Sequence, residues 1–495
     1  NATPASASMQ GNGFDYIVNG FVQVQAHAGG LASLSTTGGT NTLTAFPAYA
    51  TLSGANYSIT AYNFGEVHAQ SGASANDSAT LNDPSGSGTF NAYPTYATMT
   101  AWGNMNQATG FKTLLAAGVA GGSGVANFYD SPSDNISLTV NNSVPAPQSI
   151  TTTLAGPGFN YTLNSGFATF NLNASASGGD VANLADSGGT NTFNSTTTSP
   201  TVSSGTFSGA GFSVVVNNFS TVTVTAGSSA SDSAVLNGLA INGNAFNATP
   251  ASASMQGNGF DYIVNGFVQV QAHAGGLASL STTGGTNTLT AFPAYATLRG
   301  ANYSITAYNF AQVNAQSGPS ANDSATLNDP AGSGTFNAYP TYATMTASGN
   351  MNQATGFKTV AAVGAAGGRG TVNLNDSPSG SDTLFFNSTV AGAQSNTATL
   401  VGAGFNYSVN FGFATFNVNG GVAGGDVANL FDSAGNDALF AAGDQLQFTY
   451  PSLALNLSAY KTVNAVSVNG GTDTLTQRAI DYVLQTVGPW VFGAT

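Results

Sequence analysis

Short segments in which apolar and polar residues alternate run along the whole chain. Phe21-Val-Gln-Val-Gln-Ala26 and Tyr96-Ala-Thr-Met99 are typical, and Gly, Asn, Asp or Pro bounds most of them. Strict alternation over about four to seven residues, between residues that favour turns, is the pattern of a β-strand with one buried face. The chain is therefore predicted to be all-β and to consist almost entirely of strands and turns.

The alternating segments recur in a fixed order, which can be followed through one apolar residue that we call the marker residue. Successive marker residues are 47, 47, 56, 52, 44, 47, 47 and 56 residues apart. This gives a repeat of roughly 49 residues, about ten to the chain, and each repeat has room for about five short strands. The marker residues are Leu34, Leu81, Phe128, Leu184, Leu236, Leu280, Leu327, Leu374 and Leu430.

A longer period is superimposed on the short one. The chain matches itself at an offset of 246 residues, and residues 1–113 recur at 247–359 with seven changes. Self-similarity of this kind indicates an architecture of stacked repeats. We expect three parts, namely a first copy at 1–246, a second copy at 247–475 and a C-terminal tail at 476–495.

A single repeat is too short to cover its own apolar face, so neighbouring repeats must bury that face between them. The simplest arrangement is a parallel β-solenoid of about ten repeats, in which successive coils stack on one another. We expect coils of about 24 residues, two to each repeat. The alternative is a row of tandem small β-sandwiches, which need about 100 residues each, so that two repeats would have to combine.

Charged side chains are scarce, because the 495 residues include only 20 acidic and 6 basic ones, and the net charge is −14. A nucleic-acid-binding surface needs clustered cations, so nucleic acid is not an expected partner. No apolar run is long enough for a membrane span, and no cysteine is present for disulfides or thiolate chemistry. A charge-poor, acidic chain rich in Gly, Asn, Ser and Thr suits an extracellular or cell-surface location.

Aspartates recur near the marker residue. Examples lie four positions before it, as at Asp77 and Asp323, and two positions after it, as at Asp83 and Asp329. A catalytic carboxylate pair is needed once, whereas these aspartates occur in most repeats. We therefore expect them to cap the ends of strands by accepting hydrogen bonds from backbone N–H groups.

Two segments resemble a calcium-binding family. Asp432-Ser-Ala-Gly-Asn-Asp-Ala-Leu-Phe440 resembles the nonapeptide of RTX-type calcium β-rolls, and Gly470-Gly-Thr-Asp-Thr-Leu475 resembles it more weakly. The resemblance implies Asp432, Asp437 and Asp473 as candidate calcium ligands. Most corresponding segments carry Asn in place of the ligand aspartate, so we expect no cofactor and keep calcium as the alternative.

The same D-S-x-G-x-D/N-x-F phrase, followed by P-x-Y-A-x-L and a G-x-x-Y/F turn, resembles the tandem repeats of very large bacterial exoproteins. The resemblance covers most of the chain, implies a surface or matrix role, and supplies no catalytic residue. We therefore expect a structural extracellular repeat protein and not an enzyme. A carbohydrate-binding adhesin that recognises surface glycans is the alternative, and a β-helical polysaccharide-cleaving enzyme is less favoured.

Glu66, His68 and Trp102 are residue types that would suit a catalytic or sugar-stacking cluster. Glu66 and His68 are two apart, so on a strand they share one face, which we expect to be the outer face. The second copy replaces all three. We therefore do not expect catalysis at this cluster. The replacing residues are Gln312, Asn314 and Ser348.

The C-terminal tail departs from the strand pattern. Its apolar residues Ile480, Val483, Leu484 and Val487 follow helical spacing, and Gly488-Pro489 ends the run. The pattern predicts one short helix over residues 476–485.

The chain begins and ends inside its own repeat. Asn1 aligns with Asn247 in mid-repeat, and Leu475 lies in an opening half-repeat without a continuation. Because the open end of a solenoid exposes unpaired strand edges, we expect the tail of one copy to complete the head of the next and to build a homopolymer. The alternative is that the predicted helix caps the end. The residues expected at the contact are Asn1, Leu475, Ile480, Val483 and Leu484.

Overall fold

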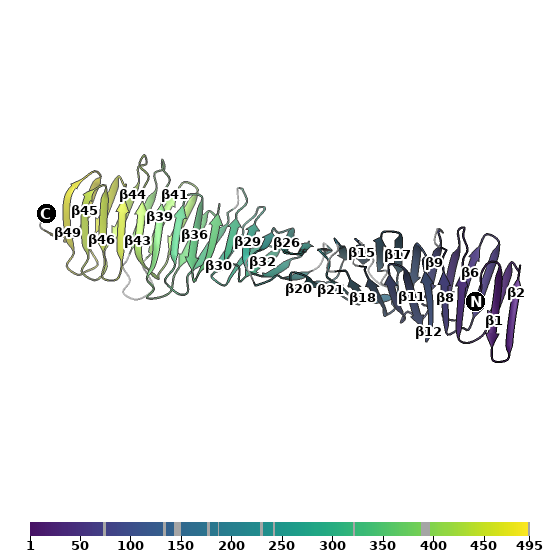
Figure 1. The fold of residues 1–495 in the computed structure, drawn as a ribbon. Helices are drawn as coiled ribbons and strands as arrows, with labels where there is room; N and C mark the ends of the chain where they lie inside the picture. The colour runs from purple at the N-terminus through teal and green to yellow at the C-terminus, as the bar shows by residue number, and fades with distance from the viewer. Residues whose placement is uncertain are drawn as a thin grey trace. The chain divides into compact units, whose positions relative to one another are not determined.

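The computed structural model describes residues 1–72, 76–131, 135–142, 150–175, 179–186, 188–227, 231–240, 243–319, 322–387 and 397–493. Within these ranges every element is a β-strand, which confirms the predicted all-β class (Figure 1). No helix that is long and apolar enough to cross a membrane is found in the described ranges.

The chain divides into two compact units. Unit 1 comprises residues 1–239 and 254–269, and unit 2 comprises residues 240–253 and 270–495. The division lies close to position 247, where the second long copy of the sequence begins.

The strands up to residue 239 are short and closely spaced along the chain. They are β1 Ser6–Gly11, β2 Phe14–Asn19, β3 Gln23–His27, β4 Leu31–Ser35, β5 Thr42–Phe46, β6 Tyr49–Gly54, β7 Tyr57–Tyr62, β8 Glu66–Gln70, β9 Ser78–Asn82, β10 Thr89–Tyr93, β11 Tyr96–Ala101, β12 Asn104–Thr109, β13 Thr113–Ala117, β14 Gly124–Tyr129, β15 Ser137–Asn142, β16 Thr151–Gly156, β17 Phe159–Asn164, β18 Phe167–Asn173, β19 Val181–Asp186, β20 Thr192–Ser199, β21 Val202–Gly209, β22 Phe212–Asn217, β23 Thr221–Thr225 and β24 Ser233–Asn237.

The strands after residue 239 follow the same order. They are β25 Asn244–Ala248, β26 Ser252–Gly257, β27 Phe260–Asn265, β28 Gln269–His273, β29 Gly276–Ser281, β30 Thr288–Phe292, β31 Tyr295–Gly300, β32 Tyr303–Tyr308, β33 Gln312–Gln316, β34 Ser324–Asn328, β35 Thr335–Tyr339, β36 Tyr342–Ala347, β37 Asn350–Thr355, β38 Thr359–Val363, β39 Gly370–Asn375, β40 Thr383–Asn387, β41 Thr397–Gly402, β42 Phe405–Val409, β43 Phe413–Asn419, β44 Val427–Phe431, β45 Ala438–Gly443, β46 Gln445–Thr449, β47 Ala454–Ser458, β48 Thr462–Val466, β49 Thr474–Ile480, β50 Val483–Val487 and β51 Val491–Phe492.

Each repeat contributes five strands, and the repeat that starts at β4 shows how they are shared between two sheets. β4 and β8 pair in parallel in one sheet, while β5, β6 and β7 form an antiparallel three-stranded meander in the other. In the next repeat the sheets exchange roles, because β9 and β13 pair in parallel in the second sheet and the meander β10–β12 lies in the first. Over two repeats, both sheets therefore gain the same number of strands.

In each unit this alternation gives two long sheets in which strands of successive repeats lie side by side. The orders in unit 1 are β4-β8-β12-β11-β10-β14-β18-β22-β21-β20-β24 and β3-β7-β6-β5-β9-β13-β17-β16-β15-β19-β23-β27. The orders in unit 2 are β32-β31-β30-β34-β38-β42-β41-β40-β44-β48-β50 and β25-β29-β33-β37-β36-β35-β39-β43-β47-β46-β45-β49-β51.

The two sheets of each unit enclose one core. In unit 1, the rings of Phe193 on β20 and Tyr262 on β27 are 6.1 Å apart across the core, and in unit 2 the rings of Phe386 on β40 and Phe416 on β43 are 5.0 Å apart. Along most strands buried and partly exposed residues alternate, as the sequence pattern predicts. The stacked repeats bury the apolar faces that one repeat alone leaves open, so the fold is the predicted β-solenoid and not a row of separate small sandwiches.

The coil differs from the expected one of about 24 residues. Parallel partners are farther apart along the chain, since Leu31 of β4 pairs with Glu66 of β8 and Thr113 of β13 pairs with Asn160 of β17. The cause is the meander, in which many chain reversals take only two residues, as between the paired residues Phe46 and Tyr49. A two-residue turn keeps both strands in one sheet, because crossing to a sheet about 10 Å away needs a longer connection.

The predicted C-terminal helix over residues 476–485 is wrong, because the chain there forms β49 and β50. β49 pairs in parallel with β45, and β50 pairs in parallel with β48 through Val463 and Leu484. The segment is rich in β-branched and aromatic residues, and an existing strand edge offers it a complete set of backbone partners. Pairing with the preceding strands therefore outweighs the helical spacing of Ile480, Val483 and Leu484.

Candidate functional site

The N-terminal edge of unit 1 is the first candidate site, because it exposes side chains that are buried where the same sequence recurs. On β2, Phe14 is 41% and Tyr16 is 66% exposed, whereas their counterparts Phe260 and Tyr262 on β27 are 4% and 1% exposed. The two strands have identical sequences. The difference therefore comes from their surroundings and not from their residues.

β27 has a parallel partner at its edge, whereas β2 has none among the described strands. β23 pairs with β27, with Val222 opposite Tyr262 and Val224 opposite Val264. The Tyr262 hydroxyl also donates a hydrogen bond to the carbonyl oxygen of Ser204, at 3.3 Å. β2 pairs only with β1, among the described strands, so its outer edge offers free backbone N–H and C=O groups.

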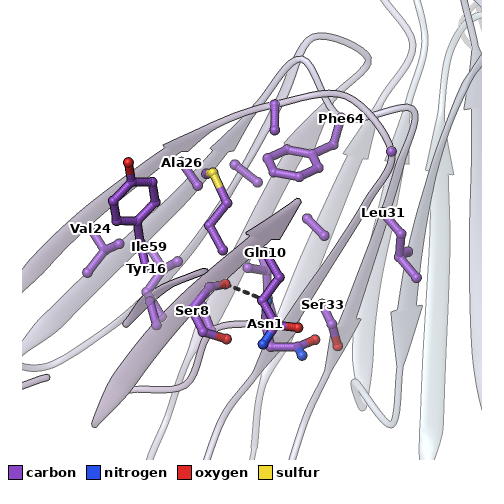
Figure 2. A pocket seen from close by; sticks show the side chains of 18 of the residues that line it. Asn1, Ser8, Gln10, Tyr16, Val24, Ala26, Leu31, Ser33, Ile59 and Phe64 are labelled. Atoms are coloured by element: carbon purple, nitrogen blue, oxygen red, sulfur yellow. Dashed lines mark hydrogen bonds between the residues drawn. The ribbon is translucent and has the colours of Figure 1, made fainter. Parts of the chain in front are cut away.

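An apolar cavity of about 580 Å³ lies beside this edge. Tyr16, Val24 and Ile59 line one side of it, and Phe64 lies across from them (Figure 2). The amino group of Asn1 donates a hydrogen bond to the carbonyl oxygen of Ser8 at 3.0 Å, at the rim of the cavity (Figure 2). The residues that line the cavity come from β1, β2, β3, β4 and β7 and the segments next to them.

The candidate self-association residues at the other end of the chain lie on strands of unit 2. Leu475 on β49 is buried, Val483 on β50 is exposed, and Ile480 and Leu484 are half-buried. Beyond them, Phe492 on β51 is 74% exposed. The last strands therefore also present apolar side chains to solvent, whereas Asn1 lies at the N-terminal edge described above.

The second candidate site is a set of buried aspartates at the places where the chain crosses between the sheets. We define an aspartate corner by three positions: the residue two after the marker residue, the residue that precedes the next meander, and an aspartate that precedes the parallel partner strand in the following repeat. Corners of this kind include residues 36/41/77, 186/191/232, 282/287/323, 376/382/426 and 432/437/473.

The third position of every corner is an aspartate that caps the meander of the preceding repeat. In the first corner, Oδ1 of Asp77 accepts hydrogen bonds from the backbone N–H of Asn41 at 2.7 Å and from its side-chain amide at 2.9 Å. Thr36 completes the set with a hydroxyl bond to Oδ2 at 3.0 Å. The capping role that the sequence predicts for these aspartates is thus present, although the donors come from a different repeat.

The other two positions vary in charge. They are Thr and Asn in the corners 36/41/77 and 282/287/323, Asp and Asn in the corner 186/191/232, and Asp at both in the corners 376/382/426 and 432/437/473. The backbone bond from the second position to the third is kept throughout, at 2.6 Å from Asn191 to Asp232 and 2.9 Å from Asp382 to Asp426. The same backbone therefore holds one, two or three carboxyl groups.

The structure brings together the three residues that the sequence proposes as calcium ligands. Asp432, Asp437 and Asp473 each place a carboxylate oxygen within 4.8 Å of the other two. Each of these carboxylates already accepts hydrogen bonds from neighbouring groups of the protein. Ser433 donates to both oxygens of Asp437, Asn469 donates to both oxygens of Asp432, and Asp473 accepts from the backbone of Asp437 and the hydroxyl of Ser467.

Burial and neighbouring charges act on the acidic groups of these corners. Burial raises the pKa of Asp437 above its ordinary value, the Ser433 hydrogen bonds oppose this, and the charges of Asp473 and Asp432 add to it. Burial likewise raises the pKa of Asp382, and the charge of Asp426 adds to that effect. Both carboxyl groups are thus easier to protonate in the folded chain than in water.

The third candidate site is a groove of amides and aromatic rings in unit 2, which the sequence analysis does not identify. Its floor is a ladder in which the side-chain amide of Asn373 donates to Asn337 at 2.7 Å, and that of Asn417 donates to Asn373 at 2.8 Å. Tyr339 and Phe440 are among its other lining residues, and its volume is about 730 Å³. The recurring N-x-N phrases of the sequence were the available signal.

Glu66 and His68 lie on the outer face of β8, as expected from their spacing. Nε2 of His68 is 3.5 Å from a carboxylate oxygen of Glu66; Glu66 is exposed and His68 is half-buried. Trp102 is 65% exposed at the turn between β11 and β12. No cleft encloses these three residues among the described cavities.

No protein-family model, no curated protein and no solved structure matches this chain.

Proposed function

We propose that the chain is a structural extracellular repeat protein whose copies join head to tail by strand addition and so build a filament, matrix or surface layer. One observation carries the proposal, namely that the apolar side chains of β2 are exposed, whereas the identical side chains of β27 are buried against the facing sheet, with β23 paired to the edge of β27. The unpaired edge and the exposed apolar side chains of β2 support the addition of strands from a second copy at that edge.

The proposed donor is the C-terminal strand pair of a second copy. On β50, Leu484 pairs with Val463, a core residue of β48, so Leu484 lies on the inward side of the sheet, as Val222 does on β23. A strand of this pattern can bring an apolar residue against Tyr16 at the open edge. Because the edge and the donor are different surfaces, the contact does not close on itself and extends into a polymer.

Light scattering and negative-stain microscopy of the full chain test this proposal. We expect polymers that lengthen with protein concentration, and we expect the variant Tyr16→Lys/Val18→Lys to stay monomeric, because two ammonium groups at the apolar edge oppose its burial. The matched control Val422→Lys/Val468→Lys changes the charge equally at residues that are 80% and 62% exposed and lie outside the strands.

The control should polymerise like the unmodified chain, and circular dichroism should show that all three proteins keep their strand content. A full chain that is monomeric at every concentration would contradict the proposal. Polymers that form equally well from the Tyr16→Lys/Val18→Lys variant would also contradict it, because they would have to use another surface.

The amide groove supports a second candidate function, which is carbohydrate binding by a surface adhesin. In the ladder each asparagine uses one N–H and one lone pair, so the other N–H and lone pair can meet sugar hydroxyls. Tyr339 and Phe440 are 36% and 37% exposed and offer flat rings for stacking. We expect binding on a glycan array to be lost in Tyr339→Ala/Phe440→Ala and kept in Trp102→Ala; no glycan bound by the unmodified chain would exclude this function.

A further inference from the structure

Of the two described corners that hold three aspartates, 376/382/426 is the one in which carboxylate oxygens lack a hydrogen-bond partner. Asp376, Asp382 and Asp426 are 8%, 1% and 0% exposed, and each places an oxygen within 4.8 Å of the other two. Within the described part of the chain, no Lys, Arg or His lies within 4.0 Å of them. Three acidic groups thus share one buried space with no cationic side chain beside them.

Two of the six carboxylate oxygens in this corner also accept no hydrogen bond of good geometry, although the backbone N–H of Ala403 is close enough to Asp382 to oppose the rise in its pKa that burial causes. Ser377 donates to Oδ1 of Asp376 and to Oδ2 of Asp382, and Asp426 accepts from the backbone of Asp382 and Gly421. Oδ2 of Asp376 and Oδ1 of Asp382 are buried and accept no hydrogen bond of good geometry. In the corner 432/437/473 all six oxygens have donors, so carboxyl count alone does not produce the deficit.

A third unpaired oxygen points to the same place. The hydroxyl of Tyr460 is buried without a hydrogen-bond partner, and Tyr460 is 3% exposed. The next residue, Lys461, donates its backbone N–H to the carbonyl oxygen of Asp426 at 3.2 Å, which places Tyr460 beside the corner. Burial raises the pKa of the Tyr460 hydroxyl, and the charges of Asp426 and Asp382 raise it further. Buried oxygen atoms without donors are costly, and an excess of oxygen atoms around one point is the environment that a hard cation offsets.

We propose that the corner formed by Asp376, Asp382 and Asp426 binds a calcium ion. Calcium takes six to eight oxygen ligands at about 2.3–2.6 Å, so two ligands on opposite sides of the ion are about 4.6–5.2 Å apart. The mutual limit of 4.8 Å between the three carboxylate oxygens fits one ion of that size. The ion would supply the positive partner that Asp376 Oδ2 and Asp382 Oδ1 lack.

The corner 282/287/323 has the same backbone arrangement but only one carboxyl group, and its neighbours supply all the hydrogen-bond donors. In the corner 282/287/323, Thr282 and Asn287 occupy the first two positions and donate to Asp323 at 2.8 Å and 2.9 Å. Replacing them with Asp376 and Asp382 removes two donors and adds two acceptors. A bound cation would replace the lost hydrogen-bond donors and neutralise the added carboxylates.

The test uses the full chain, with calcium as the probe. We expect millimolar calcium, the range in which extracellular calcium modules bind, to raise the melting temperature of unit 2 by several degrees and EDTA to reverse the change. We also expect terbium, which replaces calcium, to give luminescence excited through Tyr460, and Tyr460→Phe to reduce it.

The variant Asp376→Thr/Asp382→Asn copies the neutral corner into this position. It should fold, melt in EDTA no lower than the unmodified chain, and lose both the calcium shift and the terbium signal. The matched control Asp432→Thr/Asp437→Asn makes the same exchange in the fully hydrogen-bonded corner and should keep both responses. Absence of a calcium shift in the unmodified chain would overturn the proposal, and so would a shift that disappears only in the control.

Discussion

Replacing Asp323 with alanine is expected to destabilise unit 2 by about 3–5 kcal/mol, because it removes a buried acceptor from three donors at once. Asp323 is 1% exposed and accepts from the Thr282 hydroxyl, the Asn287 backbone N–H and the Asn287 side-chain amide, at 2.8, 2.8 and 2.9 Å. The Thr282 hydroxyl and the Asn287 backbone N–H would lose their acceptor in a buried place, and the Asn287 amide would keep only its bond to the Gly284 carbonyl oxygen. Chemical denaturation of the full chain, followed through unit 2, measures the loss.

Two matched variants separate capping from packing. Asp323→Asn keeps an oxygen for the Asn287 backbone N–H and should cost less than half as much as the alanine variant. Asp77→Ala should destabilise unit 1 by the same amount as Asp323→Ala destabilises unit 2, since Asp77 has the same three bonds in the first copy. A loss below about 1 kcal/mol for either alanine variant would show that the aspartate caps contribute little.

Supplying the missing strands at the N-terminal edge is expected to stabilise unit 1 by about 5 kcal/mol. The change is a fusion of residues 180–246 ahead of Asn1, which gives β2 the neighbours that β27 has. Phe14, Tyr16 and Val18 would then become buried, and each such side chain contributes about 1.5–3 kcal/mol. Calorimetry measures the gain, and hydrogen exchange of the β2 amides locates it.

The control for this fusion carries Val222→Asp and Val224→Asp in the added segment only. These residues face Tyr262 and Val264 in the strand pairing that serves as the template. Carboxylates at those positions cannot cover the apolar edge without a large desolvation cost, so the control should show no gain. Equal stability of the fusion and the unmodified chain would mean that the open edge does not accept a strand in the way that β27 does.

The repeat, the strands and the core could be predicted from the sequence, because each depends on neighbouring residues. Marker residues such as Leu81 and Leu327 are fully buried, as period-two alternation requires. The meanders were missed because a solenoid of purely parallel coils was expected, whereas short turns such as Pro47-Ala48 reverse the chain within one sheet. The C-terminal helix was wrong because strand partners that are distant in sequence decided the outcome there.

The candidate sites were harder to predict from the sequence, because they too depend on residues that are distant along the chain. An aspartate corner joins residues from two repeats, as when Asp426 meets Asp382 across 44 positions of sequence. Their meeting depends on the register between β40 and β44, which alternation alone does not fix. The sequence brought forward Asp432, Asp437 and Asp473 through a resemblance, yet it held no sign that hydrogen-bond donors are complete there and incomplete at Asp376.

The joining of copies through the open edge can be measured directly by cross-linking, because the chain has no cysteine of its own. If β50 adds to β2 in the register that β23 adopts on β27, Gln485 of one copy lies beside Ile17 of the next, as Thr223 lies beside Ile263. The double variant Ile17→Cys/Gln485→Cys, treated with a short thiol cross-linker, should give a ladder of covalent multimers. Either single variant should give dimers at most, and a double variant that yields only monomers would contradict head-to-tail strand addition.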